Sequence, residues 1–186
     1  MNQAYYPMLL VPDEVPAAWG GTGLKQVFER EPTAVSQELA PRLGPNKIAN
    51  GMHAGKPLGE LIDADPRGMV GPRFASGDDF PIRCSFLDVG HRTALEVHPA
   101  DHVPNAPPEL IPRTKAWYVV AAAPGATVTA GIKQGFSRHL VASRIGDPRL
   151  AEMLQELPSE PGDAYYLAPG KVHALSAGNL VFVVEH

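Results

Sequence analysis

The chain has little that would let it cross-link itself, enter a membrane or bind nucleic acid. It has one cysteine, Cys84, among 186 residues; no internal disulfide is possible, which suits a reducing compartment. No apolar run approaches the roughly twenty residues of a membrane-spanning helix, and the first ten residues do not resemble a secretory signal. The net charge is −4 and the basic residues are scattered, which argues against nucleic acid or an anionic membrane as a partner. We therefore expect a cytoplasmic protein.

What the chain does have is an ordinary globular composition, with 44% hydrophobic and 19% charged residues, and abundant turn formers, with 20 prolines and 18 glycines. This length suits one domain with one core. Residues 1–79 are rich in proline and glycine and show only brief helical patterns, at 33–39 and 58–63, so we expect an arm that wraps the rest.

From residue 80 onward, short runs of β character alternate with turn signals, which predicts a mainly antiparallel sandwich or barrel. The expected strands are 82–89, 93–98, 116–121, 126–132, 136–143, 164–167 and 180–185. One helix should interrupt them, with Asp147 as its cap, Pro148 in its first turn and an apolar stripe up to Leu157.

Two segments about seventy residues apart carry the most chemistry. Glu96 and His98 stand two apart, so on a strand both side chains point to one face. In the second segment a Gly-Asp turn at 162–163 and a Pro-Gly turn at 169–170 bring His173 to the start of a strand. Together they predict a metal site of two imidazoles and one carboxylate, a set that suits Zn, Fe, Ni or Mn.

Several short motifs follow one another in a fixed order along nearly the whole chain. They are Trp19-Gly20-Gly21, Asn50-Gly51, the segment 54–62, Phe80-Pro81 with Phe86-Leu87-Asp88, Val97-His98-Pro99, Thr114 with Trp117-Tyr118, Pro124-Gly125-Ala126, and Gly162-Asp163 to His173-Ala174. In this order they resemble the type I phosphomannose isomerases. The resemblance implies an all-β fold, a single cupin jelly-roll barrel (80–186) with an N-terminal arm (1–79) and one or two short helices. It also implies a zinc ion and the interconversion of mannose 6-phosphate and fructose 6-phosphate.

The resemblance breaks at positions that matter for that reaction. His98 and His173 match the family's metal ligands, but Glu96 replaces its Gln and Lys115 replaces its Glu. An ammonium cannot ligate a cation. The family's substrate-associated Lys is Ser85 here, the Ser before its Gln-Val-His-Pro is Ala94, and no residue can be matched to its catalytic Arg.

Several functions are therefore compatible with these residues. The leading hypothesis is a sugar-phosphate isomerase with one divalent metal, preferably zinc, on Glu96, His98 and His173. In it Lys115, crowded by a cation, could act as the base. The alternatives are a noncatalytic sugar-binding cupin and a cupin oxygenase that holds iron on the same three ligands. A metal-free barrel, in which Glu96 and Lys115 form an ion pair, is the simplest alternative.

The remaining candidates receive smaller roles. His102 could replace the lost ligand but is expected at a solvated turn with Asp101, and Trp117 is expected in the core. Three basic residues could attract a phosphate but are expected to be solvated: Arg83, Arg113 and Lys171. A homodimer that pairs through sheet edges is a further expectation.

Overall fold

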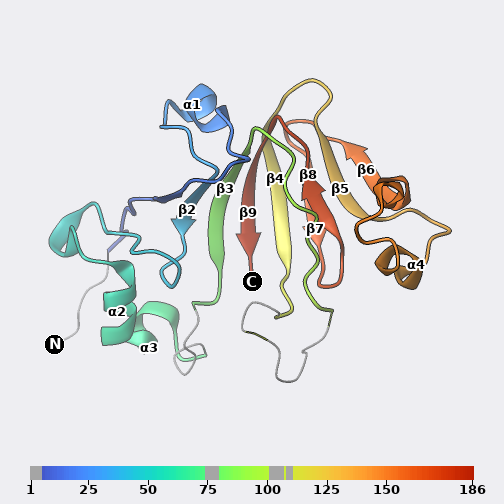
Figure 1. Cartoon of the computed structure of the whole chain (residues 1–186). Coiled ribbons are helices and arrows are strands. Elements are labelled where there is room, and N and C mark those ends of the chain that lie inside the picture. Colours follow the sequence, from blue (N-terminus) through green and yellow to red (C-terminus); the bar gives the residue numbers. More distant parts are fainter. Residues whose placement is uncertain (1–5, 74–79, 101–106, 108–110) are drawn as a thin grey trace.

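The computed structural model describes residues 6–73, 80–100, 107 and 111–186. Its strands form two antiparallel sheets that pack face to face (Figure 1). The larger has six strands in the order β1 (Asp13–Val15), β2 (Val35–Leu39), β3 (Arg83–Val89), β9 (Asn179–Glu185), β4 (Lys115–Ala122) and β7 (Ala164–Leu167). The smaller has the order β6 (Leu154–Pro158), β5 (Thr127–Ile132) and β8 (His173–Leu175). The mainly antiparallel β architecture is as predicted.

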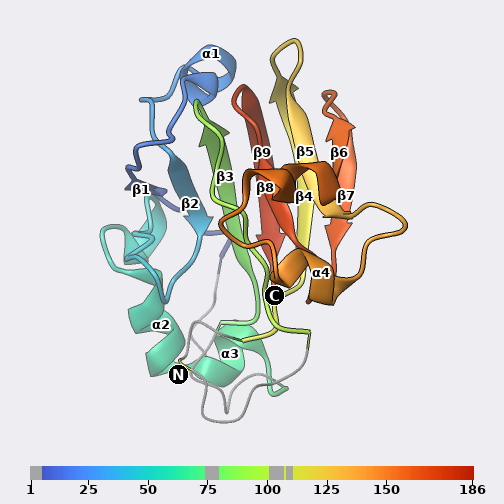
Figure 2. The ribbon, with the colours of Figure 1, turned by 45° about the vertical axis from the view of Figure 1, so that its right-hand side comes forward.

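The helices are short and lie around the sheets. They are α1 (Gly23–Phe28), α2 (Leu58–Ala64), α3 (Pro66–Val70), α4 (Arg138–Ala142) and the 3-10 helices at Gly51–His53 and Pro148–Met153. In Figure 2 α4 lies beside the smaller sheet, while α2 and α3 lie near the far end of the larger one. No helix in the described part of the chain is long and apolar enough to cross a membrane.

The inward face of the larger sheet changes from apolar to charged along the strands. Strand β9 is central, and its register with β3 and β4 places side chains in rows. The first row is Leu87, Val181 and Val119, the second is Ser85, Val183 and Trp117, and the third is Arg83, Glu185 and Lys115. The apolar members of the first two rows pack with Val128 and Leu175 of the smaller sheet in the core. The third row lies at the end where the chain reaches its C-terminus (Figure 1).

Local predictions failed where tertiary pairing decides the conformation. The expected helix at 33–39 is wrong, because Val35–Leu39 is β2, which pairs with both β1 and β3. The expected strand at 136–143 is also wrong. There Ser137 accepts a hydrogen bond from the backbone N–H of Leu140 and caps α4.

Two further elements are shorter than predicted. The segment 93–98 forms only an isolated bridge at Glu96 rather than a strand. After Asp147, which does cap through the N–H of Arg149, the chain makes a 3-10 helix only as far as Met153 and then enters β6. The β-bulge between β5 and β6 aligns Leu154 with Ile132. Pairing with β5 therefore ends the helix that the apolar pattern up to Leu157 had predicted.

The Gly20-Gly21 motif lets backbone approach the buried Asp88. A Cβ added at Gly21 would collide with the Asp88 carboxylate, so only glycine fits there. That carboxylate accepts hydrogen bonds from the N–H groups of Gly23 at 3.0 Å and Leu24 at 2.8 Å, the first residues of α1. Asp88 therefore fixes α1 to the end of β3.

Replacing Asp88 by alanine should lower the free energy of unfolding by about 2–3 kcal/mol, because two N–H groups lose a charged acceptor. Urea denaturation followed by circular dichroism measures the loss. Asp63→Ala is the matched control, since its carboxylate is 65% exposed and makes a surface ion pair with Arg42. Equal losses in the two variants would contradict the assignment.

Candidate metal centre

Backbone pairing brings Glu96 and His173 side by side. The N–H of Glu96 donates to the His173 carbonyl at 2.9 Å, and the N–H of His173 donates back to the Glu96 carbonyl at 2.8 Å. In an antiparallel pair such opposed residues project their side chains to one face. His98 lies two residues on, and its carbonyl accepts a hydrogen bond from Gly170, at the turn before β8, at 2.7 Å. The two sequence segments meet as predicted.

The donor atoms of Glu96, His98 and His173 converge. One ligand atom from each lies within 4.8 Å of the other two, and His173 Nε2 lies 3.7 Å from Glu96 Oε2. Two donors bound to one tetrahedral zinc would be roughly 3.4 Å apart. Small side-chain rotations suffice to close these atoms around one ion.

The hydrogen bonding of His173 makes its second nitrogen available as a ligand. Its Nδ1 lies 2.8 Å from the carbonyl oxygen of Lys171, which can only accept, so Nδ1 carries the proton. In the neutral ring Nε2 then presents a lone pair, the usual arrangement of a ligating histidine. The Nε2 atoms of His98 and His173 are buried without a hydrogen-bond partner in the described part of the chain. The Glu96 carboxylate 3.7 Å from His173 Nε2 calls for a positive group between the two atoms, either a proton on the ring or a metal ion, and the donor set fits a divalent ion.

The electrostatics keep the ligands in their binding forms. Interaction with the His173 ring, followed by the charge of Lys115, lowers the pKa of Glu96 to about 2 despite partial burial. Burial, followed by the positive charge of Lys115, lowers the pKa of His98. An ionised carboxylate and a neutral imidazole are the forms that bind metals.

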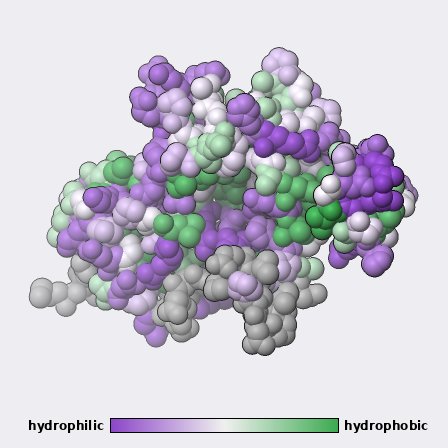
Figure 3. Space-filling view, viewed as in Figure 1, coloured by the Kyte–Doolittle hydropathy of each residue, from purple (hydrophilic) through white to green (hydrophobic). Residues whose placement is uncertain are grey.

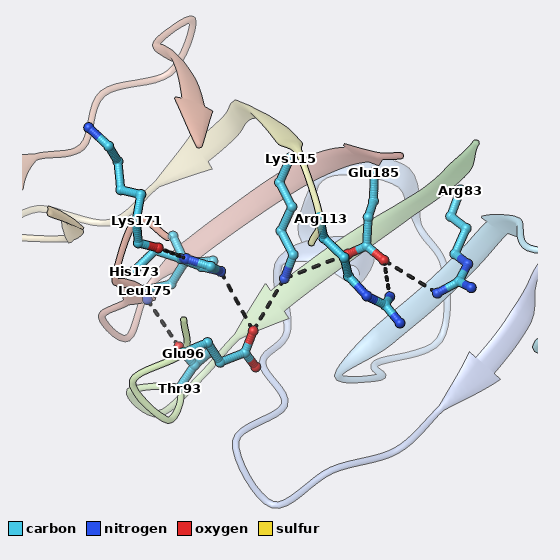
Figure 4. A network of polar contacts seen from close by, with 9 residues as sticks. All are labelled: Arg83, Thr93, Glu96, Arg113, Lys115, Lys171, His173, Leu175 and Glu185. Atoms are coloured by element: carbon cyan, nitrogen blue, oxygen red, sulfur yellow. Dashed lines mark hydrogen bonds and ion pairs between the residues drawn. The ribbon is translucent and has the colours of Figure 1, made fainter. Parts of the chain in front are cut away.

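Lys115 lies between the metal-ligand candidates and the end of β9 (Figure 4). Its Nζ is 3.2 Å from Glu96 Oε2 and 3.6 Å from Glu185 Oε2. The side chain is only 11% exposed, so it does not turn away into solvent. The ion pair expected between Glu96 and Lys115 is present, and this ammonium is one cation already at the edge of the site.

Glu185 is the residue that sequence reasoning missed. Arg83 Nη1 lies 3.4 Å from its Oε1, and Arg113 bonds the same oxygen. Burial opposes its charge, but Lys115 and Arg113 hold the pKa of Glu185 below its usual range. Arg83 and Arg113 were expected to be solvated, yet their side chains are only 22% and 19% exposed. The signal was cross-strand register, which motif spacing does not reveal.

The other residues considered from the sequence are not part of the three-ligand cluster. Trp117 is 4% exposed, in the core as expected, and its ring meets that of His173 edge-on at 5.3 Å. His53 is buried and stacks on Tyr6. Cys84 is a free, partly buried thiol, whereas His102 and Asp101 lie outside the described residues.

Comparison with known proteins identifies relatives along nearly the whole chain. A Bacillus subtilis protein named "Putative mannose-6-phosphate isomerase YvyI" is 32% identical over 185 residues, which is 96% of this chain and 57% of the relative. The B. subtilis mannose-6-phosphate isomerase ManA is 27% identical over 96% of this chain and 57% of its own. The chain is a homologue of the mannose-6-phosphate isomerases. The resemblance to the type I phosphomannose isomerases is confirmed, although no family model matches.

Solved structures agree on the fold. The crystal structure of the B. subtilis mannose 6-phosphate isomerase superposes with a TM-score of 0.84 at 30% identity, covering 96% of this chain and 58% of that one. A zinc-bound mannose 6-phosphate isomerase superposes with a TM-score of 0.70 at 12% identity, covering 95% of this chain and 67% of that one. The fold is therefore cupin-like. The chain spans about 57% of the length of the two B. subtilis relatives compared by sequence.

Proposed function

We propose that this protein is a metal-dependent sugar-phosphate isomerase that interconverts mannose 6-phosphate and fructose 6-phosphate. The observation that carries the proposal is a pair of buried imidazole nitrogens, from His98 and His173, that have no hydrogen-bond partner among the described residues and lie beside the carboxylate of Glu96. It supports metal chemistry in a chain whose relatives bear the name of that isomerase. We take zinc as the first metal to test, because a relative of the same fold was solved with zinc.

Three residues would hold the ion. Glu96 supplies an oxygen and His98 and His173 supply nitrogens, and the Lys171 carbonyl keeps the ring of His173 in the ligating tautomer. Bound there, a divalent ion would polarise the oxygen of a substrate carbonyl or hydroxyl. Trp117 is buried and lies edge-on to the ring of His173, so it places apolar surface beside this ligand.

Isomerisation also needs a group that moves a proton between adjacent carbons. Lys115 remains our candidate for this group, because its Nζ lies at the edge of the site, 3.2 Å from Glu96 Oε2 and 3.6 Å from Glu185 Oε2.

The direct test is to incubate the purified chain with mannose 6-phosphate and Zn, Mn, Ni or Fe in turn. Fructose 6-phosphate should form with at least one metal and not after chelation. His98→Ala should lose the product, whereas His139→Ala, an exposed histidine on α4, should keep it. Absence of product with all four metals would remove the proposal.

A second function, sugar binding without turnover, is favoured by one observation. Lys115 stands where the resemblance places a glutamate ligand, and its ammonium pairs with Glu96 at 3.2 Å. A ligand that binds only the folded state raises the melting temperature. Stabilisation by mannose 6-phosphate without conversion, in the metal-loaded chain, would support this function over the first.

A further inference from the structure

The charged row at the end of the larger sheet places cations inside the sandwich. Arg83 on β3 and Lys115 on β4 are the direct cross-strand partners of Glu185 on β9. They continue the inward-facing rows that contain Ser85, Val183 and Trp117, so their side chains project into the space between the sheets. Charges in such a position lose part of their hydration and need partners.

Those partners are too few. Arg83, Arg113 and Lys115 bring three positive charges to Glu185, and among the described residues the only other carboxylate in direct contact with them is Glu96, through Lys115. The Nε–H of Arg113 is buried and has no acceptor among the described residues. A buried guanidinium donor without an acceptor indicates that an anion is missing from its surroundings.

A cavity opens on this surplus of donors. It has a volume of about 180 Å³, and its lining includes Gln37, Arg83, Ser85, Arg113, Lys115 and Glu185. A neighbouring cavity of about 310 Å³ shares Arg83, Arg113 and Glu185, so the two guanidinium groups are reached from both. The space-filling view shows a hollow between the sheets with hydrophilic side chains gathered at its lower side (Figure 3).

We propose that Arg83 and Arg113 form the binding site for a phosphate monoester, with Glu185 as the anion that holds the two guanidinium groups until phosphate arrives. The assignment rests on the proposed function in taking this phosphate to belong to the sugar substrate. Paired guanidinium groups match the tetrahedral dianion in charge and in donor geometry. Lys115 contacts both Glu96 and Glu185, so one ligand can reach this site and the metal centre together.

Inorganic phosphate is the probe, with the chain stripped of metal so that no ion can bind it. Isothermal titration at fixed ionic strength should show one phosphate per chain and weaker binding of chloride. Arg83→Met should weaken phosphate binding about tenfold or more, since a charge-assisted contact is lost. The phosphate affinity of Arg83→Lys should lie between those of Arg83→Met and the wild type. Arg92→Met should bind phosphate as the wild type does, because Arg92 pairs with Glu156 at the surface.

Glu185→Gln separates a binding site from a purely structural network. It frees both guanidinium groups from a competing carboxylate, so phosphate should bind several times more tightly even if the protein is less stable. No phosphate binding by the wild type at millimolar concentration, or unchanged affinity in both Arg83→Met and Glu185→Gln, would overturn the assignment.

The outcomes for site and function are separable. Phosphate binding that depends on Arg83, without conversion of mannose 6-phosphate by any metal-loaded form, would remove the isomerase and leave the anion site standing. Conversion of mannose 6-phosphate with the same KM in the wild type and Arg83→Met would instead remove the anion site and leave the isomerase standing.

Discussion

Replacing His98 by alanine is expected to lower the affinity for zinc by about a hundredfold or more. Loss of a residue that only orients a ligand already costs 10–100-fold, and His98 is proposed as a ligand itself. Its Nε2 is buried without a hydrogen-bond partner in the described structure, and one of its ring nitrogens lies within 4.8 Å of the ligand atoms of Glu96 and His173. Isothermal titration of the chelator-treated protein with zinc, and elemental analysis of the purified protein, measure the change.

Two variants sharpen this result. His139→Ala removes an imidazole from the exposed face of α4 and should leave zinc binding intact. Glu96→Gln restores the family's residue and keeps an oxygen donor, so its effect should be smaller than that of His98→Ala. Equal zinc affinity in His98→Ala and the wild type would rule out the proposed centre.

The metal-ligand candidates could be predicted because their chemistry is local. The separation of Glu96 and His98 by two residues, and the turns before His173, fix which side chains share a face. The isolated bridge between Glu96 and His173 then places the two segments together without a regular strand at 93–98. The expected strand there was wrong, yet the expected convergence was right, since one pair of backbone hydrogen bonds is enough.

The charged row of Arg83, Lys115 and Glu185 could not be predicted as one cluster because it depends on pairings between distant segments. Arg83, Lys115 and Glu185 are far apart in sequence and become neighbours through the β3, β9 and β4 register. Lys115 could be assigned to the metal centre from the resemblance, but Arg83 was expected to be solvated and no sequence pattern indicates a partner for Glu185. The same limit explains the error at 33–39, where pairing with β1 and β3 decides in favour of a strand. The 1–79 and 80–186 division stays a prediction, although β1 and β2 of the arm belong to the same sheet as β3.

The charge swaps relative to the family are mutually consistent. A lysine at position 115 would leave an isolated cation at the metal centre, but here it contacts carboxylates at 96 and 185. The arginines at 83 and 113 in turn neutralise Glu185. Arg83 lies on the same face of β3 as Ser85, two residues earlier, so it places a positive charge close to the position where the resemblance expects a lysine.

Replacing Lys115 by methionine should raise zinc affinity about tenfold or more. The ammonium lies 3.2 Å from Glu96 Oε2, so it competes with a metal for that oxygen and repels it at short range. Methionine keeps the length and apolar stem of the side chain and removes the charge. Lys115→Glu should raise affinity further, because it adds a carboxylate where the resemblance places the fourth ligand. Zinc titration of the metal-free proteins measures both.

Lys171→Met is the matched control, because the Lys171 side chain points away from Glu96 (Figure 4) while its carbonyl still orients His173. If general electrostatics governed metal binding, this variant would gain affinity as much as Lys115→Met. In a metal-free barrel, by contrast, Lys115 would serve only as the partner of Glu96 and Glu185, and its removal would lower the melting temperature without creating a zinc site. A gain in zinc affinity confined to position 115 therefore requires that the three ligands bind metal and that Lys115 opposes metal binding. A less stable Lys115→Met protein that binds no zinc would refute the metal centre.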